Sequence, residues 1–154
     1  MTPHYDDLLV SLATVHGLPV NLVRAIVQTE SAGDPWAYRH EPGYRWLVGN
    51  PTAMSQTERI GQMSSWGLMQ VMGAVAREAG FVGPFPQLCD PAIGLDYGCR
   101  HLAGYFKKYQ NWPDTIASYN AGRPVRNDAG QYANQVYVNK VQTRWNAYDV
   151  HDQA

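Results

Sequence analysis

The chain has 154 residues, a hydrophobic content of 45% and a formal net charge of -1. A chain of this length can bury one substantial core but is too short for two ordinary domains, so we expect a single domain over residues 1–154. Its 12 lysine and arginine residues are scattered, and this distribution predicts no binding face for nucleic acid or anionic lipid.

Neither a membrane-spanning helix nor a secretory signal is predicted. An integral membrane helix requires about 18 consecutive apolar residues, and no stretch of the chain approaches that length. Residues 1–7 lack both the positively charged region and the apolar region of a signal peptide.

The first part of the chain predicts two helices followed by a long loop. Residues 5–16 carry apolar side chains at helical intervals, and Gly17 provides a natural stop. Pro19 suits the first turn of a second helix, which ends at Glu30. Glycines and prolines then punctuate residues 32–64. We expect this segment to be a long irregular loop, of the kind that is usually functional or mobile.

The second part predicts more helices and too little period-two alternation for a sheet of any size. Helical patterns occur at residues 65–72 and 74–79. Asp90 followed by Pro91 is a strong start signal, because it combines a side-chain cap with a proline at the first helical position. That helix is expected to end near residue 109. Two further helices are expected at residues 112–122 and about 132–145. The predicted fold class is therefore mainly α.

Cys89 and Cys99 are the only cysteines. A disulfide between them would need the chain to fold back along the helix that contains Cys99, so we expect two reduced, packed thiols. Their spacing matches no zinc pattern, and the five histidines are dispersed without a paired-ligand motif. The sequence therefore predicts no catalytic metal and no other cofactor.

Glu30 is the residue with the most chemical information. At helical spacing, Val23, Ile26 and Val27 lie on the face that Glu30 shares, so its carboxyl group would lie against hydrocarbon. Loss of solvation favours the neutral acid and raises its pKa, as a general acid near neutral pH requires. The alternative is an exposed glutamate in a last helical turn. For Glu30 taken alone, we favour that alternative.

Three later segments follow Glu30-Ser31 in order along the chain. They are Ser-Trp-Gly-Leu-Met-Gln-Val at residues 65–71, Ala-Ser-Tyr-Asn-Ala-Gly at residues 117–122 and Tyr-Val-Asn-Lys-Val at residues 137–141. Each is short, but the four together resemble the catalytic domain of SLT-type lytic transglycosylases, which belong to the goose-type lysozyme superfamily. The resemblance spans most of the chain. It implies a lysozyme-like fold and an enzyme that cleaves peptidoglycan.

The resemblance also implies roles for individual side chains. Glu30 would be the catalytic acid, with support from Ser31 and from Tyr137, which is similar to the family tyrosine that hydrogen-bonds the acid. The implied substrate contacts come from Met69, Gln70, Tyr119 and Asn120. Part of this set also has a structural interpretation, since Met69 suits the core and Asn120 lies close to a glycine that could end a helix.

The chain departs from the family pattern in two places. The connection between Ser31 and Gly67 is longer than in the family, and it contains an aromatic and charged cluster that we expect to form part of the substrate wall. This cluster consists of Trp36, Tyr38, Arg39, His40, Glu41, Tyr44, Arg45 and Trp46. Before Tyr137, Ala133-Asn134 stand where many relatives carry Glu-Thr. Any contact made by that acidic residue is therefore absent or replaced.

The number of carboxylates separates the possible mechanisms. Ordinary glycosidases need two acidic groups across the scissile bond, whereas the resemblance supplies only Glu30. It implies that Glu30 protonates the glycosidic oxygen and then accepts the proton of the C6 hydroxyl of N-acetylmuramic acid, which leaves a 1,6-anhydro end. A hydrolytic muramidase is the alternative, with Glu41, Glu58 or Asp34 as its second carboxylate. A non-catalytic glycan-binding domain of a phage particle is an alternative from a different class.

The expected partner is a glycan strand of peptidoglycan, on which the chain would act as a monomer. Aromatic residues make up 12% of the chain, and flat rings offer sugars both an apolar face and a hydrogen-bonding edge. Because no signal is predicted, we expect a bacteriophage protein of the endolysin kind, synthesised in the host cytoplasm and released at lysis or carried in a virion. A signal removed from the sequence is the alternative. In both cases the protein would act in the periplasm or cell wall.

Overall fold

The computed structural model describes residues 5–152 of the chain. The prediction of a mainly α fold is confirmed. The helices are α1 (Asp6–Val15), α2 (Val20–Glu30), α3 (Gln56–Gln62), α4 (Gly73–Glu78), the 3₁₀ helix η2 (Phe85–Cys89), α5 (Pro91–Tyr109), α6 (Trp112–Ala121) and α7 (Gln135–Asp152). The strands are β1 (Tyr38–His40), β2 (Ser64–Trp66) and β3 (Val71–Met72).

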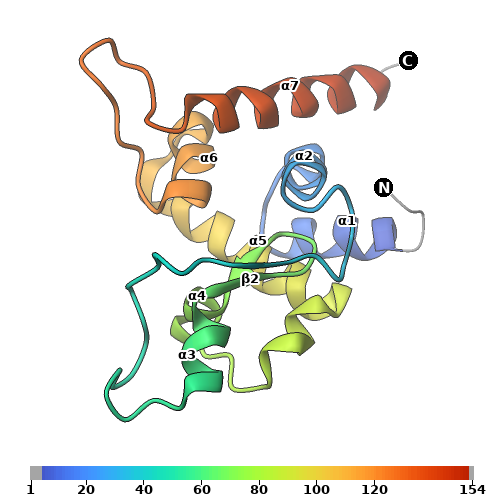
Figure 1. The fold of residues 1–154 in the computed structure, drawn as a ribbon. Helices are drawn as coiled ribbons and strands as arrows, with labels where there is room; N and C mark the ends of the chain where they lie inside the picture. The colour runs from blue at the N-terminus through green and yellow to red at the C-terminus, as the bar shows by residue number, and fades with distance from the viewer. Residues whose placement is uncertain (1–4, 153–154) are drawn as a thin grey trace.

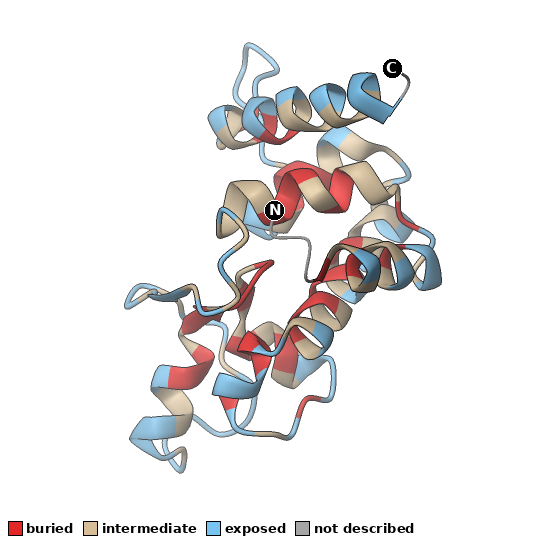
Figure 2. Ribbon diagram, turned by 90° about the vertical axis from the view of Figure 1, so that its right-hand side faces the viewer, coloured by how far each residue is buried: buried red, intermediate tan, exposed pale blue. Residues whose placement is uncertain are grey.

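Helix α2 packs against both α1 and α7 (Figure 1). It begins directly after Pro19 and ends at Glu30, as predicted. Val23, Ile26 and Val27 are fully buried, and Figure 2 shows the buried residues of the molecule gathered on α2, on α5 and on the segments between them. The end of α2 is therefore fixed in position by a packed core on both sides.

Helix α5 crosses the middle of the molecule and contacts α1, α6 and η2 (Figure 1). Its predicted start is confirmed: the side chain of Asp90 accepts a hydrogen bond from the backbone N–H of Ala92 at 2.9 Å, and Pro91 is the first helical residue. Leu95 and Leu102 are fully buried in the core. This helix joins the half of the molecule that contains α2 to the half that contains the sheet.

The chain forms a small antiparallel sheet in the order β1-β2-β3. Its strands β2 and β3 lie where a helix over residues 65–72 was predicted. Tyr38 pairs with Trp66, and Ser65 pairs with Met72. The strands are only two or three residues long, so they leave no alternation that a sequence pattern can reveal. The sheet attaches the segment that follows α2 to the segment that precedes α4.

The predicted helix over residues 65–72 is wrong because of the turn between β2 and β3. Gly67 (φ 70°) and Gln70 (φ 48°) both adopt the left-handed backbone conformation, which a right-handed helix excludes. Leu68 and Met69, whose apolar side chains suggested a helical face, are buried within this turn instead.

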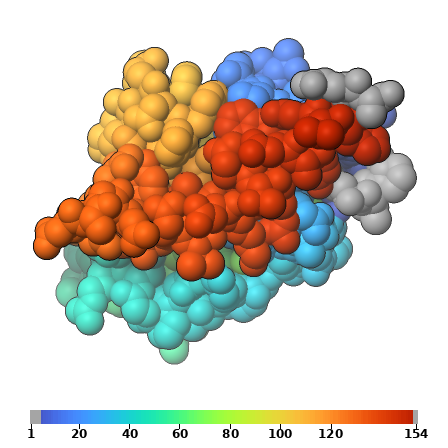
Figure 3. Space-filling model, turned by 90° about the horizontal axis from the view of Figure 1, so that it is seen from above, coloured from blue at the N-terminus to red at the C-terminus, as the bar shows by residue number. Residues whose placement is uncertain are grey.

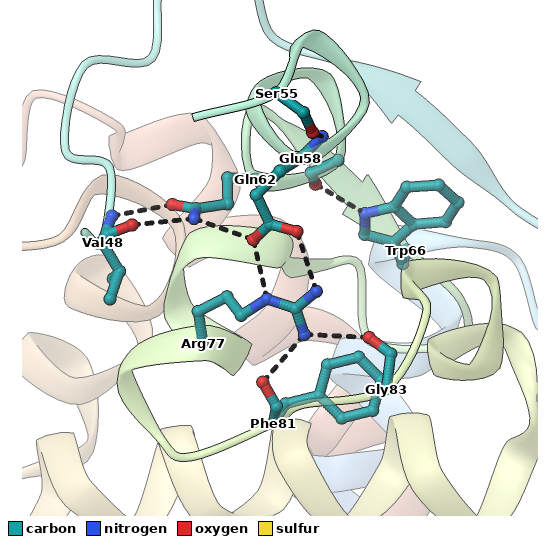
Figure 4. Close-up of polar contacts among 9 residues, drawn as sticks. Val48, Ser55, Glu58, Gln62, Trp66, Arg77, Phe81 and Gly83 are labelled. Atoms are coloured by element: carbon teal, nitrogen blue, oxygen red, sulfur yellow. Dashed lines mark hydrogen bonds and ion pairs between the residues drawn. The ribbon is translucent and has the colours of Figure 1, made fainter. Parts of the chain in front are cut away.

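The segment from residue 32 to residue 64 is less irregular than predicted, since it contains β1 and α3. Ser55 caps α3 by accepting a hydrogen bond from the N–H of Glu58 at 3.1 Å. The Glu58 carboxylate pairs with Arg77 of α4, with 2.8 Å between Oε1 and Nε (Figure 4). Arg77 also donates to the backbone oxygens of Phe81 and Gly83. These contacts hold α3 and α4 together beneath the sheet.

The loop before α3 is tied to the same helix through Gln62. The side chain of Gln62 is buried, and it bonds both backbone groups of Val48, accepting from the N–H at 2.7 Å and donating to the oxygen at 2.9 Å (Figure 4). Trp66 of β2 donates from Nε1 to the backbone oxygen of Gly61 at 3.1 Å. The long connection is thus anchored at several points.

Cys89 and Cys99 are both free and buried, as predicted for reduced, packed thiols. Within residues 5–152, no group of three or more His, Cys, Asp or Glu side chains is placed to hold a metal ion. No helix in that part of the chain is both long and apolar enough to cross a membrane.

The close packing of the β2–β3 turn can be tested with two glycine variants. Gly67 and Gly17 have similar φ values, 70° and 66°. A Cβ atom on Gly67 would lie 2.3 Å from the backbone oxygen of Leu88, whereas one on Gly17 would meet nothing within 4 Å. We expect Gly17→Ala to lower the free energy of unfolding by about 1–2 kcal/mol through backbone strain alone. Gly67→Ala should lower it by a further 1–3 kcal/mol, roughly the cost of overpacking. Urea denaturation measures both, and an equal loss in the two variants would contradict the close packing.

Candidate active site

Glu30 lies at the C-terminal end of α2, on a cavity of about 700 Å³. The helix ends here because Ala32 (φ 54°) and Gly33 (φ 84°) adopt left-handed conformations, which turn the chain away from the helix axis. The cavity lies among α2, the segment that follows it, the β2–β3 turn and α7. In Figure 3 the surface of α7, in red, lies beside that of the segment after α2, in light blue to cyan.

Glu30 is partly buried. It is therefore not the exposed last-turn glutamate that was the alternative prediction. Tyr137 of α7 donates a hydrogen bond from Oη to Oε1 of Glu30 at 2.6 Å, which is the contact that the resemblance implies. Burial raises the pKa of Glu30 above its ordinary value, and the Tyr137 hydrogen bond and the charges of Arg39 and Lys140 oppose that rise. Burial also raises the pKa of Tyr137 well above its ordinary value, so its hydroxyl remains a donor at neutral pH.

Ser31 connects the end of α2 to the β2–β3 turn. Its Oγ lies within hydrogen-bond distance of two backbone oxygens, 3.1 Å from that of Val27 and 2.8 Å from that of Leu68. The N–H of Gly33 donates back to the same Oγ at 3.2 Å. Ser31 therefore fixes the chain next to Glu30, which fits the supporting role predicted for it.

Tyr119 and Met69 contact each other through the backbone of the turn. The hydroxyl of Tyr119 donates to the backbone oxygen of Met69 at 2.8 Å. The side chain of Met69 is fully buried and packs so closely on Gly98 that a Cβ there would lie 2.4 Å from its sulfur. Burial and the nearby charge of Glu30 raise the pKa of Tyr119 well above its ordinary value. Neither Met69 nor Tyr119 is among the residues that line the Glu30 cavity. The side chain of Met69 belongs to the core, and its backbone oxygen anchors Tyr119.

Gln70 lines the cavity, but its amide is already bonded within the protein. Its Oε1 accepts from the hydroxyl of Ser65 at 2.9 Å, and its Nε2 donates to the backbone oxygens of Ala37 and Gly67, each at 3.0 Å. The side chain therefore fastens the segment before β1 to the turn between β2 and β3. Contact of Gln70 with a sugar stays a prediction.

Asn120 is exposed at the end of α6 and is not among the residues that line the Glu30 cavity. Its Oδ1 accepts from Nδ2 of Asn134 at 2.9 Å, and the same Nδ2 lies 3.0 Å from the backbone oxygen of Ala117. Asn134 is one of the two residues, Ala133 and Asn134, at which the sequence predicts a departure from the family pattern. There it connects α6 to the start of α7, on which Tyr137 lies.

Aromatic and cationic side chains also line the cavity. Trp36, Tyr38 and Arg39 belong to the aromatic and charged cluster predicted for the substrate wall, while Lys140 and Arg144 come from α7. The side chains of Trp36 and Tyr38 are 72% and 50% exposed. Neither Lys140 nor Arg144 belongs to the site residues predicted from the sequence. They follow Tyr137 by three and seven residues, and this helical spacing places all three on one face of α7.

The carboxylates considered as second catalytic groups differ in position. Glu41 pairs with Arg39, with 2.5 Å between Oε1 and Nε, and Glu58 pairs with Arg77 in the network between α3 and α4. Asp34 lines the cavity and is exposed, and its Oδ1 accepts from the N–H of Trp36 at 2.9 Å. Asp34 is therefore the carboxylate that shares the cavity with Glu30.

The contact between Tyr137 and Glu30 can be tested by titration. Because the hydroxyl of Tyr137 stabilises the charged carboxylate, Tyr137→Phe should raise the pKa of Glu30 further. The ¹³C signal of the Glu30 carboxyl group, followed by NMR over pH, measures the change. Tyr119→Phe is the matched control, since its hydroxyl donates to Met69, and it should shift the titration less. An unchanged titration in Tyr137→Phe would show that the hydrogen bond does not form.

Comparisons with known proteins identify the family and the fold of the chain. Residues 10–141 match the transglycosylase SLT domain family. The X-ray structure of an inactive mutant of the lytic transglycosylase Slt from Pseudomonas aeruginosa is similar to the chain, with a TM-score of 0.67 and 22% sequence identity. The alignment covers 99% of this chain and 25% of Slt, so the chain spans about a quarter of the length of that protein. No curated protein matches the chain significantly. Since the family match covers most of its length, the chain belongs to the transglycosylase SLT domain family.

Proposed function

We propose that the chain is a peptidoglycan lytic transglycosylase that cleaves the β-1,4 bond between N-acetylmuramic acid and N-acetylglucosamine, with Glu30 as general acid and then general base. The observation that carries the proposal is the partly buried Glu30 carboxyl, held by Tyr137 on an open cavity. Its raised pKa favours the protonated form that an acid catalyst needs. Family membership and the lysozyme-like fold support the same function.

In the first step, Glu30 donates its proton to the glycosidic oxygen, and the bond from that oxygen to C1 of the muramic acid breaks. The N-acetyl group of the same sugar stabilises the cation that develops at C1. The Glu30 carboxylate then takes the proton of the C6 hydroxyl, and O6 forms a bond to C1. Glu30 ends protonated, no water is consumed, and the product carries a 1,6-anhydro ring.

Tyr137 would position Glu30 through both states of this cycle. Its hydroxyl donates to the carboxyl oxygen that faces it, and this hydrogen bond becomes stronger when Glu30 is charged. The tyrosine therefore prevents burial from raising the pKa of Glu30 so far that the carboxylate could not be restored. A lone acid that must serve as donor and acceptor requires such a balance.

Exposed aromatic rings on the cavity support a carbohydrate substrate. Trp36 and Tyr38 line the cavity from the segment that follows α2, and both residues are exposed. Flat rings of this kind stack on the apolar faces of sugars while their polar edges accept or donate hydrogen bonds. We propose that they bind the glycan strand next to the bond that is cleaved.

An internal nucleophile makes a second carboxylate unnecessary. The C6 hydroxyl belongs to the sugar that is attacked, so the reaction avoids the entropic cost of bringing in a second reactant. Two of the three candidate carboxylates, Glu41 and Glu58, are engaged in ion pairs. This supports the transglycosylase over the hydrolytic muramidase. Asp34 keeps the muramidase as the second candidate, because it lies on the same cavity as Glu30.

We propose further that the chain forms a single catalytic domain and acts as a monomer on glycan strands in the periplasm or cell wall. The family match over residues 10–141 supports one domain. Release at phage lysis, or carriage in a phage particle, stays a prediction from the sequence.

The reaction can be identified from its products. Incubation of the protein with purified peptidoglycan should release fragments with 1,6-anhydromuramic acid ends, detected by mass spectrometry. Fragments with reducing ends, which are one water molecule heavier, would instead identify a muramidase. Asp34→Asn is the matched variant, because a transglycosylase should keep its turnover of peptidoglycan within severalfold while a muramidase that uses Asp34 should lose it. Absence of cleavage would contradict both enzymatic functions and favour a glycan-binding domain.

Glu30→Gln should change activity and stability in opposite directions. The variant cannot transfer a proton, so we expect turnover to fall by a factor on the order of 10²–10⁴ or more. Slt in the similar structure is likewise inactive when a glutamate is replaced by glutamine. Because the pKa of Glu30 is raised in the folded protein, its ionised form at pH 7 destabilises the fold relative to the unfolded chain.

We therefore expect Glu30→Gln to raise the melting temperature at pH 7. The gain should shrink as the pH falls toward the ordinary value of 4.5, because the wild-type carboxyl then becomes protonated in both states. Calorimetry between pH 4 and pH 8 measures the difference. Two outcomes would contradict the role assigned to Glu30. One is full turnover by the variant. The other is a gain in melting temperature over the wild type that is smaller at pH 7 than at pH 4.

A further inference from the structure

The wall of the Glu30 cavity carries positive charge although the chain as a whole has a net charge of -1. Its charged lining residues are three cations, Arg39, Lys140 and Arg144, and two carboxyl groups, those of Glu30 and Asp34. Arg39 is paired with Glu41 outside the lining, and the first catalytic step needs Glu30 in its neutral form. The lining therefore keeps two cations without an ion-pair partner within residues 5–152, Lys140 and Arg144, against one carboxylate, that of Asp34.

Neither of these two side chains forms an ion pair with a carboxylate of the described residues. Arg144 is nevertheless held in place, since its Nη1 donates to the hydroxyl oxygen of Thr29 at 2.9 Å, and that hydroxyl donates to the backbone oxygen of Ala25 at 2.7 Å. Arg144 is partly buried and Lys140 is exposed one helical turn before it. An unpaired guanidinium fixed at the edge of a cavity is a suitable partner for a carboxylate.

The substrate of the proposed function carries carboxylates at the appropriate place. The sugar backbone of peptidoglycan is neutral, but each muramic acid bears a stem peptide on its lactyl group, and that peptide has free carboxylates. Because Glu30 must reach the glycosidic oxygen of a muramic acid, the stem of that same sugar begins beside the Glu30 cavity. A cationic wall next to Glu30 lies within reach of the first residues of the stem.

We propose that Lys140 and Arg144 bind a carboxylate of the stem peptide on the muramic acid that is cleaved. This inference rests on the proposed function and adds a preference for glycan strands that carry peptides. Effects on Glu30 do not account for both residues. The cations that oppose the rise of the Glu30 pKa are Arg39 and Lys140, so the tuning of Glu30 does not account for Arg144, which Thr29 holds at the cavity.

The proposal can be tested by binding, in the Glu30→Gln protein, so that no strand is cleaved during the measurement. One ligand consists of soluble glycan strands with uncrosslinked stem peptides. The other consists of the same strands after their carboxylates have been converted to amides with carbodiimide and ammonia. We expect roughly tenfold tighter binding of the carboxylate strands in calorimetric titration, as for a charge-assisted contact in a partly desolvated site.

The double substitution Lys140→Gln/Arg144→Gln, added to the Glu30→Gln protein, should reduce the ratio of its affinities for carboxylate and amide strands to about one. Lys107→Gln/Arg123→Gln is the matched control, because it removes the same two charges from exposed positions that do not line the cavity, and it should keep the ratio. Because both ligands are measured on the same variant, the ratio cancels any effect of the substitutions on folding or on the rest of the cleft. Thermal melts of both double variants check that the fold is retained.

Two results would overturn the proposal. One is equal binding of carboxylate and amide strands, and the other is a preference that survives the loss of both cations. If the wild-type protein still forms anhydro ends in either case, only the cationic wall is refuted and the proposed function stands. A protein that binds neither strand and forms no anhydro ends would refute both.

Discussion

The packing of α7 against α2 is the constraint on which the site depends. It brings the hydroxyl of Tyr137 to 2.6 Å from a carboxyl oxygen of a residue more than a hundred positions earlier in the chain. A carboxyl group that is partly removed from water tends to stay protonated, and the tyrosine limits that tendency. The same face of α7 carries Lys140 and Arg144 to the cavity. One helix–helix contact therefore sets both the proton affinity of the acid and the charge of its surroundings.

The other half of the site depends on the backbone of the β2–β3 turn. Ser31 and Tyr119 reach this turn from α2 and α6, and their hydroxyls meet the backbone oxygens of Leu68 and Met69. Gly67 allows the turn to lie directly against the backbone at Leu88, where a side chain would collide. Several residues that appear as a substrate-binding motif in the sequence thus hold the cleft together. Their carbonyl groups and compact packing matter as much as their side chains.

The lining of the cavity divides by chemistry as well as by origin. The wall built from the segment after α2 presents the exposed rings of Trp36 and Tyr38, which suit the neutral faces of sugars. The wall built from α7 presents cations that have no carboxylate partner among the described residues. A polymer with a neutral saccharide backbone and anionic peptide branches matches this division. The long connection between α2 and β2 contributes the aromatic wall.

Local sequence patterns predicted α1, α2, α4, α5, α6 and α7, the cap at Asp90 and the position of Glu30 at a helix end, because these follow from spacing along a few turns of chain. Four short motifs in order along the chain indicated the family. Only the tertiary structure decided how residues 65–72 fold, since strands of two or three residues and a left-handed Gln70 leave no periodic pattern. It also decided that the Gln70 amide is bonded internally, that Asn120 lies outside the cavity and that Arg144 lies on it. Each of these depends on contacts between segments far apart in the chain, which periodicity within one segment does not encode.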